Sequence, residues 1–288
     1  MAVPEEAVAA GVPVADAVRV PVVVVVVAVV VLTVVVVLVV VVPVRAVIVA
    51  APRTLAGMVA AVLFDFYGTL ARAVEWGPTV EEVLTRRGVA VDPEARARWE
   101  AEAADGVDHR QHSTDRDRYV AWEQARLRRF AEACRVDAVD LDEVVGELYA
   151  TMKEFTLEAY DEVPEVLAAL RDRGLRVAVC SNWDWDLDQA LRRTALDHLV
   201  DVVVTSAQAG ARKPHPRIYR QTLDRCGVAA PDALFVGDTW GPDVEGPLAV
   251  GLRPVHVWRD GDERRAPPPP LVDGVKRVRN LGGVLDLV

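Results

Sequence analysis

The sequence contains few cysteines, and their spacing argues against a disulfide framework. Only Cys134, Cys180 and Cys226 occur among 288 residues, and none of them forms a CxxC pair. We therefore expect three reduced thiols in a reducing compartment, each buried as a small apolar side chain.

The chain also lacks an excess of positive charge. Its formal net charge is −10, which argues against a nucleic-acid partner because such a partner favours a basic surface. Small anionic substrates stay compatible with this charge, because a local cluster of cations or a bound metal outweighs the global sign. The length allows one large domain or two small ones.

A third absence marks the N-terminal extension, residues 1–57. The stretch from Val22 to Val42 carries no charged residue, and as a helix it would just cross a bilayer core of about 30 Å. The residues before it include Glu5 and Asp16 and no basic cluster, so the extension is not a secretory signal.

Two interpretations of this extension stay open. It is either a membrane anchor or a valine-rich stretch that precedes the true start of the protein at Met58, and we favour the second. Arg45 and Arg53 follow the apolar stretch, so the positive-inside rule places the C-terminal part in the cytoplasm if the anchor is real. We expect a cytoplasmic catalytic part in both cases, with a single-pass membrane protein as the alternative.

From Met58 onward, apolar runs alternate with helical patterns. The runs cover 59–65, 176–182, 200–206, 233–239 and 253–259, and the helical patterns between them cover 163–174, 186–196, 216–227 and 242–251. Continuous apolar runs are typical of parallel strands that are covered on both faces. The alternation predicts an α/β fold, a Rossmann-like doubly wound parallel sheet.

One interval interrupts this alternation. Between Leu70 and Tyr160 we find no strand pattern, only charge-rich helical segments such as 79–88, 93–106 and 117–134. We therefore predict an inserted all-helical domain at 75–160, with the sheet domain formed by 58–74 and 161–288.

Polar residues follow four of the five predicted strands at the carboxyl end, where open parallel sheets bind their ligands. They are Asp65 and Thr69, Ser181 and Asn182, Lys213, and Asp238 and Asp243. Any one of them fits a helix cap or a turn, but their agreement at four strand ends predicts a site.

The chemistry of this set points to phosphate. Asp65, Asp238 and Asp243 would repel one another when ionised, and Mg²⁺ with oxygen ligands relieves that repulsion. Ser181 and Lys213 supply a donor and a positive charge for phosphoryl oxygens. Asp65 is then available as a nucleophile that forms an aspartyl-phosphate.

Four stretches in this order carry a family resemblance: "FDFYGTL", "CSNWDWDL", "GARKPHPRIY" and "FVGDTWGPDVEGPLAVGL". They resemble the four signature motifs of the haloacid dehalogenase-like hydrolase superfamily. The match covers Met58 to the C-terminus, and the helical insert resembles the C1-type cap of that superfamily, which closes over the active site.

The resemblance implies a role for each site residue. Asp65 is the nucleophile and a metal ligand, the backbone carbonyl of Tyr67 is a second ligand, and Asp238 and Asp243 complete the metal site. Ser181, Asn182 and Lys213 bind the phosphate, and Lys213 also stabilises the transition state. Thr69 orients the loop after the nucleophile.

Tyr67 departs from the phosphatase pattern, which has aspartate there as general acid and base. A phenol is a poor base at neutral pH, and dehalogenases of the superfamily commonly have tyrosine at this position, since a departing halide needs no proton. Dehalogenases, however, work without a metal and lack the pair Asp238 and Asp243. Arg86 and Arg87 are weak candidates for a dehalogenase's carboxylate-binding arginines.

We therefore predict a Mg²⁺-dependent phosphatase that acts on a small phosphomonoester, with a 2-haloacid dehalogenase as the alternative. A catalytically weak binding protein on the same fold is a third possibility. Two groups of side chains are candidates for contacts to the substrate. They are an aromatic rim of Trp183, Trp185 and Trp240, and the predicted selectors His109, Arg110, His112, Arg116 and Arg118.

Overall fold

The computed structural model describes residues 58–259 and 268–288, together with the backbone of two strands, β1 (Val26–Val31) and β2 (Val34–Val39). The chain divides into two units, residues 1–50 and 51–288. The central sheet and the candidate site belong to the second unit.

The helical interpretation of the valine-rich stretch is wrong where the structure describes it. β1 and β2 pair antiparallel, with Val31 opposite Val34, because the branched β-carbon of valine favours extended backbone. Among the described residues, no helix is long and apolar enough to cross a bilayer. The rest of 1–57, including Arg45 and Arg53, lies outside the described residues.

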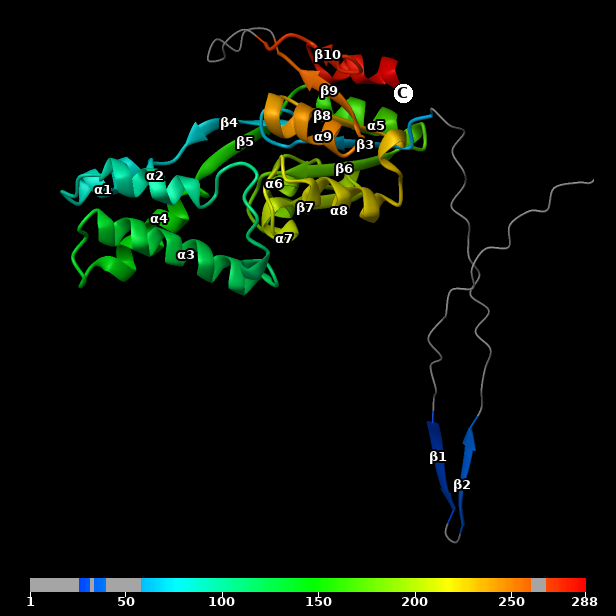
Figure 1. Ribbon diagram of the computed structural model, residues 1–288, viewed down its shortest axis with the longest axis horizontal. Helices are drawn as coiled ribbons and strands as arrows, with labels where there is room; N and C mark the ends of the chain where they lie inside the picture. The colour runs from blue at the N-terminus through cyan, green and yellow to red at the C-terminus, as the bar shows by residue number, and fades with distance from the viewer. Residues whose placement is uncertain (1–25, 32–33, 40–57, 260–267) are drawn as a thin grey trace, which may run out of the picture. The chain divides into compact units, whose positions relative to one another are not determined.

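The central sheet has six strands in the order β10–β9–β8–β3–β6–β7 (Figure 1). Every neighbouring pair is parallel, which confirms the predicted doubly wound sheet. The strands are β3 (Ala61–Phe64), β6 (Arg176–Ser181), β7 (Val202–Thr205), β8 (Ala233–Gly237), β9 (Arg253–Val257) and β10 (Lys276–Val278).

Helices cover both faces of this sheet. They are α5 (Val163–Asp172), α6 (Leu187–Arg193), α7 (Ser206–Ala209), α8 (Pro216–Cys226) and α9 (Gly246–Ala249). Short turns of 3-10 helix lie at η2 (Asp197–Leu199), η3 (Ala230–Asp232) and η5 (Leu281–Leu287), and η4 (Gly241–Glu245) is a π-helical turn.

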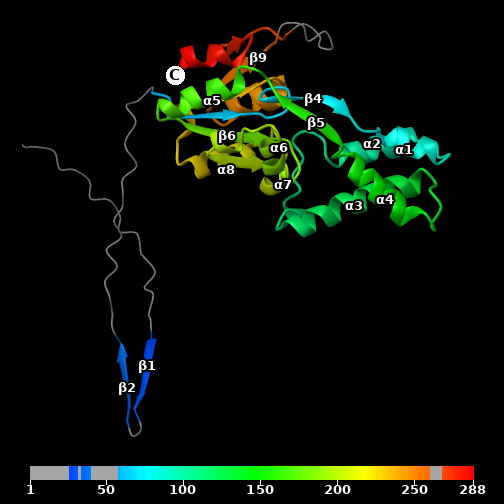
Figure 2. The ribbon, with the colours of Figure 1, turned by 180° about the vertical axis from the view of Figure 1, so that it is seen from behind.

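Alternate residues of β3 pack into two different cores. Val62 and Phe64 belong to the cluster with α5, α6 and η5, whereas Ala61 and Leu63 belong to the cluster with α7 and α8. Figure 2 shows α5 and α8 on opposite sides of β6. Since successive side chains of a strand point to opposite faces, a strand buried on both faces needs an unbroken apolar run.

The helices of the sheet domain follow their sequence signals closely. α5 buries Val163, Val166, Leu167 and Leu170, which is the spacing of a single helix face. α8 begins with a proline and ends before Gly227, whose φ of 69° is left-handed. The three cysteines are buried free thiols, as predicted.

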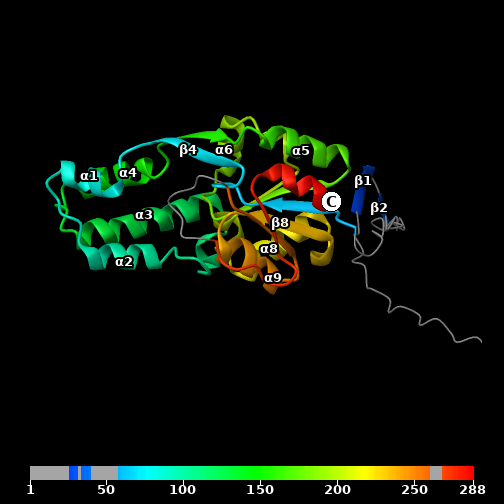
Figure 3. The same cartoon turned by 90° about the horizontal axis from the view of Figure 1, so that it is seen from above.

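The predicted absence of strands between Leu70 and Tyr160 is wrong. β4 (Ala71–Trp76) and β5 (Phe155–Ala159) form a separate antiparallel pair. Most of β4 is exposed, so it lacks the continuous apolar run that marks the central strands. This two-stranded ribbon of β4 and β5 joins the sheet domain to the helices that follow β4 (Figure 3).

Between the two ribbon strands lies the helical insert, residues 77–154. It contains α1 (Val80–Arg86), α2 (Pro93–Ala101), η1 (Arg110–His112), α3 (Arg116–Ala133) and α4 (Leu141–Thr151). These helices share a hydrophobic core of their own, which includes Leu84, Leu127, Phe130 and Leu148. The insert therefore packs as a separate layer beside the sheet domain.

Candidate active site

The nucleophile candidate Asp65 lies directly after β3, the strand at the centre of the sheet. Its backbone N–H donates to Val236 O at 2.9 Å, which ties it to the neighbouring strand. β6 ends at Ser181 and β8 ends at Gly237, one residue before Asp238. Because all three strands are parallel, their carboxyl ends bring these side chains to the same edge of the sheet.

Asp65 is held by two donors at one oxygen. The Ser181 hydroxyl donates to Asp65 Oδ1 at 2.8 Å, and the Lys213 ammonium donates to the same oxygen at 2.7 Å. Lys213 also donates to Asp243 Oδ1 at 2.6 Å. All four side chains are buried, so water screens these charge pairs only weakly. The second oxygen of Asp65 accepts no hydrogen bond from the described residues.

Two further carboxylates complete the cluster. Asp65, Asp238 and Asp243 each offer an oxygen within 4.8 Å of the others. The Thr69 hydroxyl donates to Asp238 Oδ1 at 3.1 Å, and the backbone N–H of Thr239 donates to Asp243 Oδ2 at 2.9 Å. The structure thus brings together the predicted nucleophile, the predicted metal-binding carboxylates, and Thr69.

The charges of this cluster do not balance. The pKa of Asp243 is raised to about 7, mainly by burial. The Lys213 ammonium lowers this pKa, whereas the Asp65 and Asp238 carboxylates raise it. For Lys213, burial favours the neutral amine, but Asp243 and Asp65 outweigh burial and raise its pKa. The cluster therefore contains one charged ammonium group, that of Lys213, against the three carboxyl groups of Asp65, Asp238 and Asp243.

Two glycines give the acidic side chains room. Gly68 has a left-handed φ of 83°, and a Cβ placed there would lie 2.5 Å from Asp238 Oδ2. A Cβ at Gly237 would lie 2.4 Å from the carboxyl carbon of Asp243. Only glycine permits this close approach of backbone and carboxylates.

Asn182 and Tyr67 occupy positions that their sequence motifs do not reveal. The Asn182 carboxamide accepts from Lys213 N at 2.6 Å and donates to Lys213 O at 3.1 Å, so it holds the backbone of the lysine. The half-buried ring of Tyr67 packs edge-on against Trp76 at 5.9 Å. The described residues offer the Tyr67 hydroxyl no hydrogen bond.

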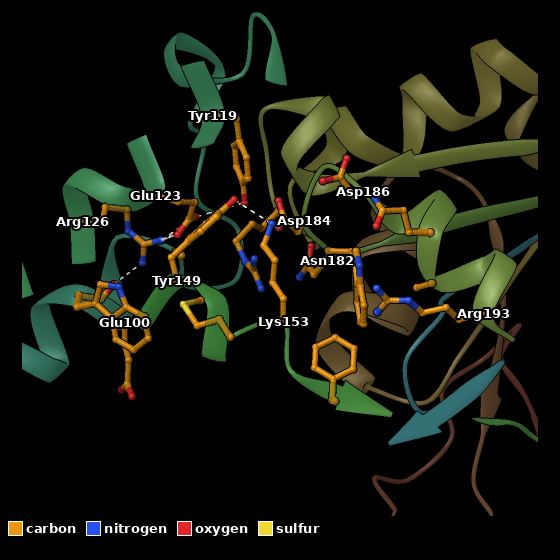
Figure 4. A pocket seen from close by; sticks show the side chains of 18 residues that line it. Glu100, Tyr119, Glu123, Arg126, Tyr149, Lys153, Asn182, Asp184, Asp186 and Arg193 are labelled. Carbon is orange, nitrogen blue, oxygen red and sulfur yellow. Dashed lines mark hydrogen bonds and ion pairs between the residues drawn. The ribbon is translucent and has the colours of Figure 1, made fainter. Parts of the chain in front are cut away.

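A cavity of about 520 Å³ lies beside this cluster, between the helical insert and the sheet domain (Figure 4). Its walls come from α2, α3, α4, β5, the loop after β6, and α6. Lining side chains that we did not predict include Tyr119, Tyr149, Lys153, Asp184 and Arg212. Tyr119 comes from α3 and Tyr149 from α4, so these residues converge only when the insert folds.

Of the predicted aromatic rim and the predicted selectors of the insert, one residue lines this cavity. Trp183 lines it, packed edge-on against Phe66 and Phe155. Trp185 and Trp240 are not among its lining residues, and the Trp240 indole donates to Glu245 at 3.0 Å.

None of the five predicted selectors lines the cavity either. His109 stacks on Trp122, and Arg116 forms an ion pair with Asp186 that links the insert to the sheet domain. Arg87 contacts Glu143 and Glu147 on the insert.

Comparison with known proteins identifies the family. A family model described as haloacid dehalogenase-like hydrolase matches residues 59–251, which is more than half of the chain and contains all four motifs. The chain belongs to this family. The prediction of a hydrolase with the Rossmann-like fold of this superfamily is confirmed.

Two curated relatives show how far the likeness extends. The chain is 36% identical over 132 residues to haloacid dehalogenase-like hydrolase domain-containing protein 3 of Mus musculus, a match that covers 46% of this chain and 53% of the relative. It is 30% identical over 235 residues to a phosphatase of Mycobacterium tuberculosis, which covers 79% of this chain and 97% of the relative. The first relative is thus matched over about half its length.

Solved structures share the fold. A haloacid dehalogenase-like phosphatase of Thermococcus onnurineus matches with a TM-score of 0.51 at 24% identity, covering 79% of this chain and 96% of that one. A 2-haloacid dehalogenase of Pseudomonas syringae matches with a TM-score of 0.56 at 19% identity, covering 80% and 98%. Because phosphatases and dehalogenases both share this fold, the choice between the two reactions depends on the site.

Proposed function

We propose that the protein is a Mg²⁺-dependent phosphatase that hydrolyses a small phosphomonoester through an aspartyl-phosphate on Asp65. The observation that carries the proposal is the buried cluster of Asp65, Asp238 and Asp243 around a single ammonium group. The full-length similarity to a mycobacterial phosphatase supports the same reaction class.

The donor set fits magnesium. Three carboxylates within 4.8 Å of one another are hard oxygen ligands. Burial is the main cause of the raised pKa of Asp243, and the neighbouring Asp65 and Asp238 carboxylates raise it further. We assign Asp65, Asp238, Asp243 and the backbone carbonyl of Tyr67 as the ligands. When bound, Mg²⁺ would supply charge that stabilises the phosphoryl group during its transfer.

The protein's own residues carry the two steps. In the first, a carboxylate oxygen of Asp65 forms a bond to phosphorus while the bond from phosphorus to the leaving oxygen breaks. Ser181 and Lys213, which both contact Asp65, are positioned to donate to the phosphoryl oxygens. In the second, water attacks phosphorus, and inorganic phosphate and free Asp65 are released.

Proton transfer distinguishes this site from one with a second aspartate. Tyr67 is a poor base, and its ring packs against Trp76 in the ribbon. Poor basicity limits the activation of water in the second step. For the first step, which needs an acid in place of the usual aspartate, we propose that the leaving oxygen takes its proton from water or from the substrate itself. This chemistry favours leaving groups that are stable as anions, such as phenols, over simple alcohols.

We further propose that the helical insert acts as a cap at 75–160. Its loop before η1 contacts the active-site loop directly, since Gly106 N donates to Lys213 O at 3.1 Å. Asn182 also donates to Asp105 of the insert at 3.0 Å. An insert that moves away from the sheet domain would break both contacts and open the cavity.

The decisive assay measures turnover of 4-nitrophenyl phosphate. We expect activity with Mg²⁺, loss in EDTA and recovery when Mg²⁺ is added back. Asp65→Asn removes the nucleophile and should lower kcat at least about a thousandfold. Asp188→Asn changes an exposed carboxylate on α6 and serves as the matched control, with unchanged kcat.

Tyr67 supports a second candidate, a 2-haloacid dehalogenase in which Asp65 displaces halide and forms an ester. Full activity in EDTA with halide release from 2-chloropropionate would establish that reaction and refute the phosphatase. Absence of turnover on a broad panel of phosphate esters, together with calorimetric Mg²⁺ binding, would instead identify a binding protein.

A further inference from the structure

The cavity beside the catalytic cluster concentrates unsatisfied hydrogen-bond donors. Among the described residues, four buried side-chain nitrogens lack a hydrogen bond: Trp99 Nε1, Arg126 Nε, Arg212 Nε and Arg259 Nε. The first three belong to residues that line this one cavity. All are N–H donors, and a buried donor without an acceptor is costly. Arg126 Nε lies 3.3 Å from Glu102 Oε2, so Trp99 and Arg212 are the lining residues whose buried donor has no nearby acceptor among the described residues.

The acidic residues that line the cavity already have cationic partners. The pairs are Glu123 with Arg126, Asp184 with Lys153, Asp186 with Arg116, and Glu100 with Arg96. Figure 4 shows the first two of these pairs on the cavity wall. Two lining cations, Arg193 and Arg212, have no acidic partner among the residues that the structure describes. The lining has four acidic and four basic side chains and so no net charge, but the acids are paired and two of the cations are left without an acidic partner.

Of these two cations, Arg212 is better placed than Arg193 to bind a ligand in the cavity. It is half-buried, whereas Arg193 is exposed, and it directly precedes Lys213 of the catalytic cluster. Its backbone N–H donates to Val107 O at 3.0 Å, which fixes it to the loop of the insert.

The remaining walls of the cavity favour a flat, partly apolar ligand. Aromatic side chains from both layers line it, namely Trp99, Tyr119, Tyr149, Phe155 and Trp183. A volume of about 520 Å³ is in the range of sites for small organic ligands. The cavity also borders the catalytic cluster, because Asn182 lines it and holds the Lys213 backbone.

We propose that this cavity binds the leaving group of the phosphoester, and that the leaving group is a flat, carboxylate-bearing molecule whose carboxylate binds Arg212. The inference rests on the phosphatase function proposed above and names the substrate class. A guanidinium binds a carboxylate through two parallel hydrogen bonds, and the structure shows no acidic partner for Arg212 among the described residues that would compete with the ligand.

The test compares two isosteric esters, 4-carboxyphenyl phosphate and 4-carbamoylphenyl phosphate. With Mg²⁺ we expect kcat/KM at least about tenfold higher for the carboxylate, as a charge-assisted hydrogen bond implies. Arg212→Gln should bring the ratio to within about twofold of unity by lowering kcat/KM for the carboxylate ester. Arg192→Gln changes an exposed arginine outside the cavity and should keep the preference.

Equal kcat/KM for the two esters in the unaltered protein would overturn the inference, even if both are hydrolysed well. A preference that persists in Arg212→Gln would overturn the role of Arg212. If Arg212→Gln does not fold, Arg212→Lys can be used instead. Lysine keeps the positive charge but cannot form two parallel hydrogen bonds to a carboxylate, so most of the preference for the carboxylate ester should be lost.

A binding assay separates this inference from the phosphatase proposal. If neither these esters nor 4-nitrophenyl phosphate is hydrolysed, the phosphatase proposal fails, and calorimetry of the products on Asp65→Asn still decides the cavity. We expect 4-hydroxybenzoate to bind at least about tenfold more tightly than 4-hydroxybenzamide. No binding of either product, or equal binding of both, would refute a carboxylate site.

Discussion

Replacing Lys213 by methionine should destabilise the fold strongly, because it strands two carboxylates in the interior. Lys213 is 2% exposed and donates to Asp65 at 2.7 Å and to Asp243 at 2.6 Å. Methionine fills a similar volume, so the substitution removes the charge with little change in packing. Asp65 and Asp243 then stay buried beside Asp238 with no ammonium between them.

The size of this effect follows from the burial of the partners. Removing one member of a buried ion pair costs about 3–5 kcal/mol, since the other charge is left uncompensated. Lys213 has two such partners, which places the cost at the upper end of that range. For a domain of this size, 1 kcal/mol shifts Tm by about 2–4 °C, so a cost of about 5 kcal/mol should lower Tm by about 10–20 °C.

Urea unfolding in EDTA measures this loss directly as a lower midpoint at unchanged m value. Lys153→Met is the matched control, because Lys153 also forms an ion pair but its side chain is 37% exposed, and it should cost at most about 1 kcal/mol. Adding Asp243→Asn to Lys213→Met should recover part of the loss. A cost below about 1 kcal/mol for Lys213→Met would refute the reasoning, because it would mean that the carboxylates are not stranded.

The other predictions concern backbone, proton binding and the leaving group. Gly68→Ala should cost more in urea than Gly174→Ala; both glycines have φ near 80°, but only Gly68 approaches Asp238. Equal losses of unfolding free energy in the two variants would rule out the close contact between Gly68 and Asp238. Burial lowers the pKa of His109 to about 4, with a further contribution from Arg212. The unfolded chain, with an ordinary pKa of about 6.5, therefore binds the proton first, and stability should fall by on the order of 3 kcal/mol between pH 6.5 and 4. His109→Gln should flatten that profile, and a profile unchanged in this variant would contradict the assignment. Tyr67→Asp should raise kcat most on alkyl phosphates, whose leaving groups need a proton; an equal gain on aryl phosphates would argue against a missing general acid.

The central sheet could be predicted from sequence because its strands are buried on both faces. Such strands need continuous apolar runs, and the runs at 59–65, 176–182 and 233–239 contain β3, β6 and β8. The ribbon of β4 and β5 was missed for the opposite reason. Exposed strands carry mixed polar and apolar residues, and only their pairing with each other across the insert defines them.

The position of the candidate active site could be predicted for a related physical reason. In a parallel sheet the carboxyl end of each strand is fixed by where its apolar run stops, so Asp65, Ser181 and Asp238 were placed together by position alone. The direction of a side chain is not fixed in this way. Asn182 follows the same strand as Ser181, but its carboxamide binds the backbone of Lys213.

The cavity between the helical insert and the sheet domain could not be predicted, because no single segment contains it. Its aromatic walls come from α3 and α4 of the insert and from the loop after β6 of the sheet domain. Within α3 the buried face includes Tyr119, Glu123 and Arg126, and a polar residue on a buried helix face has no distinctive sequence signal. Arg212 is equally inconspicuous, since the sequence does not show which way the side chain beside Lys213 points. In the folded protein, every acidic residue that lines the cavity forms an ion pair with a cation other than Arg212. Arg212 is therefore left without an acidic partner among the described residues, and this becomes visible only when both layers are folded.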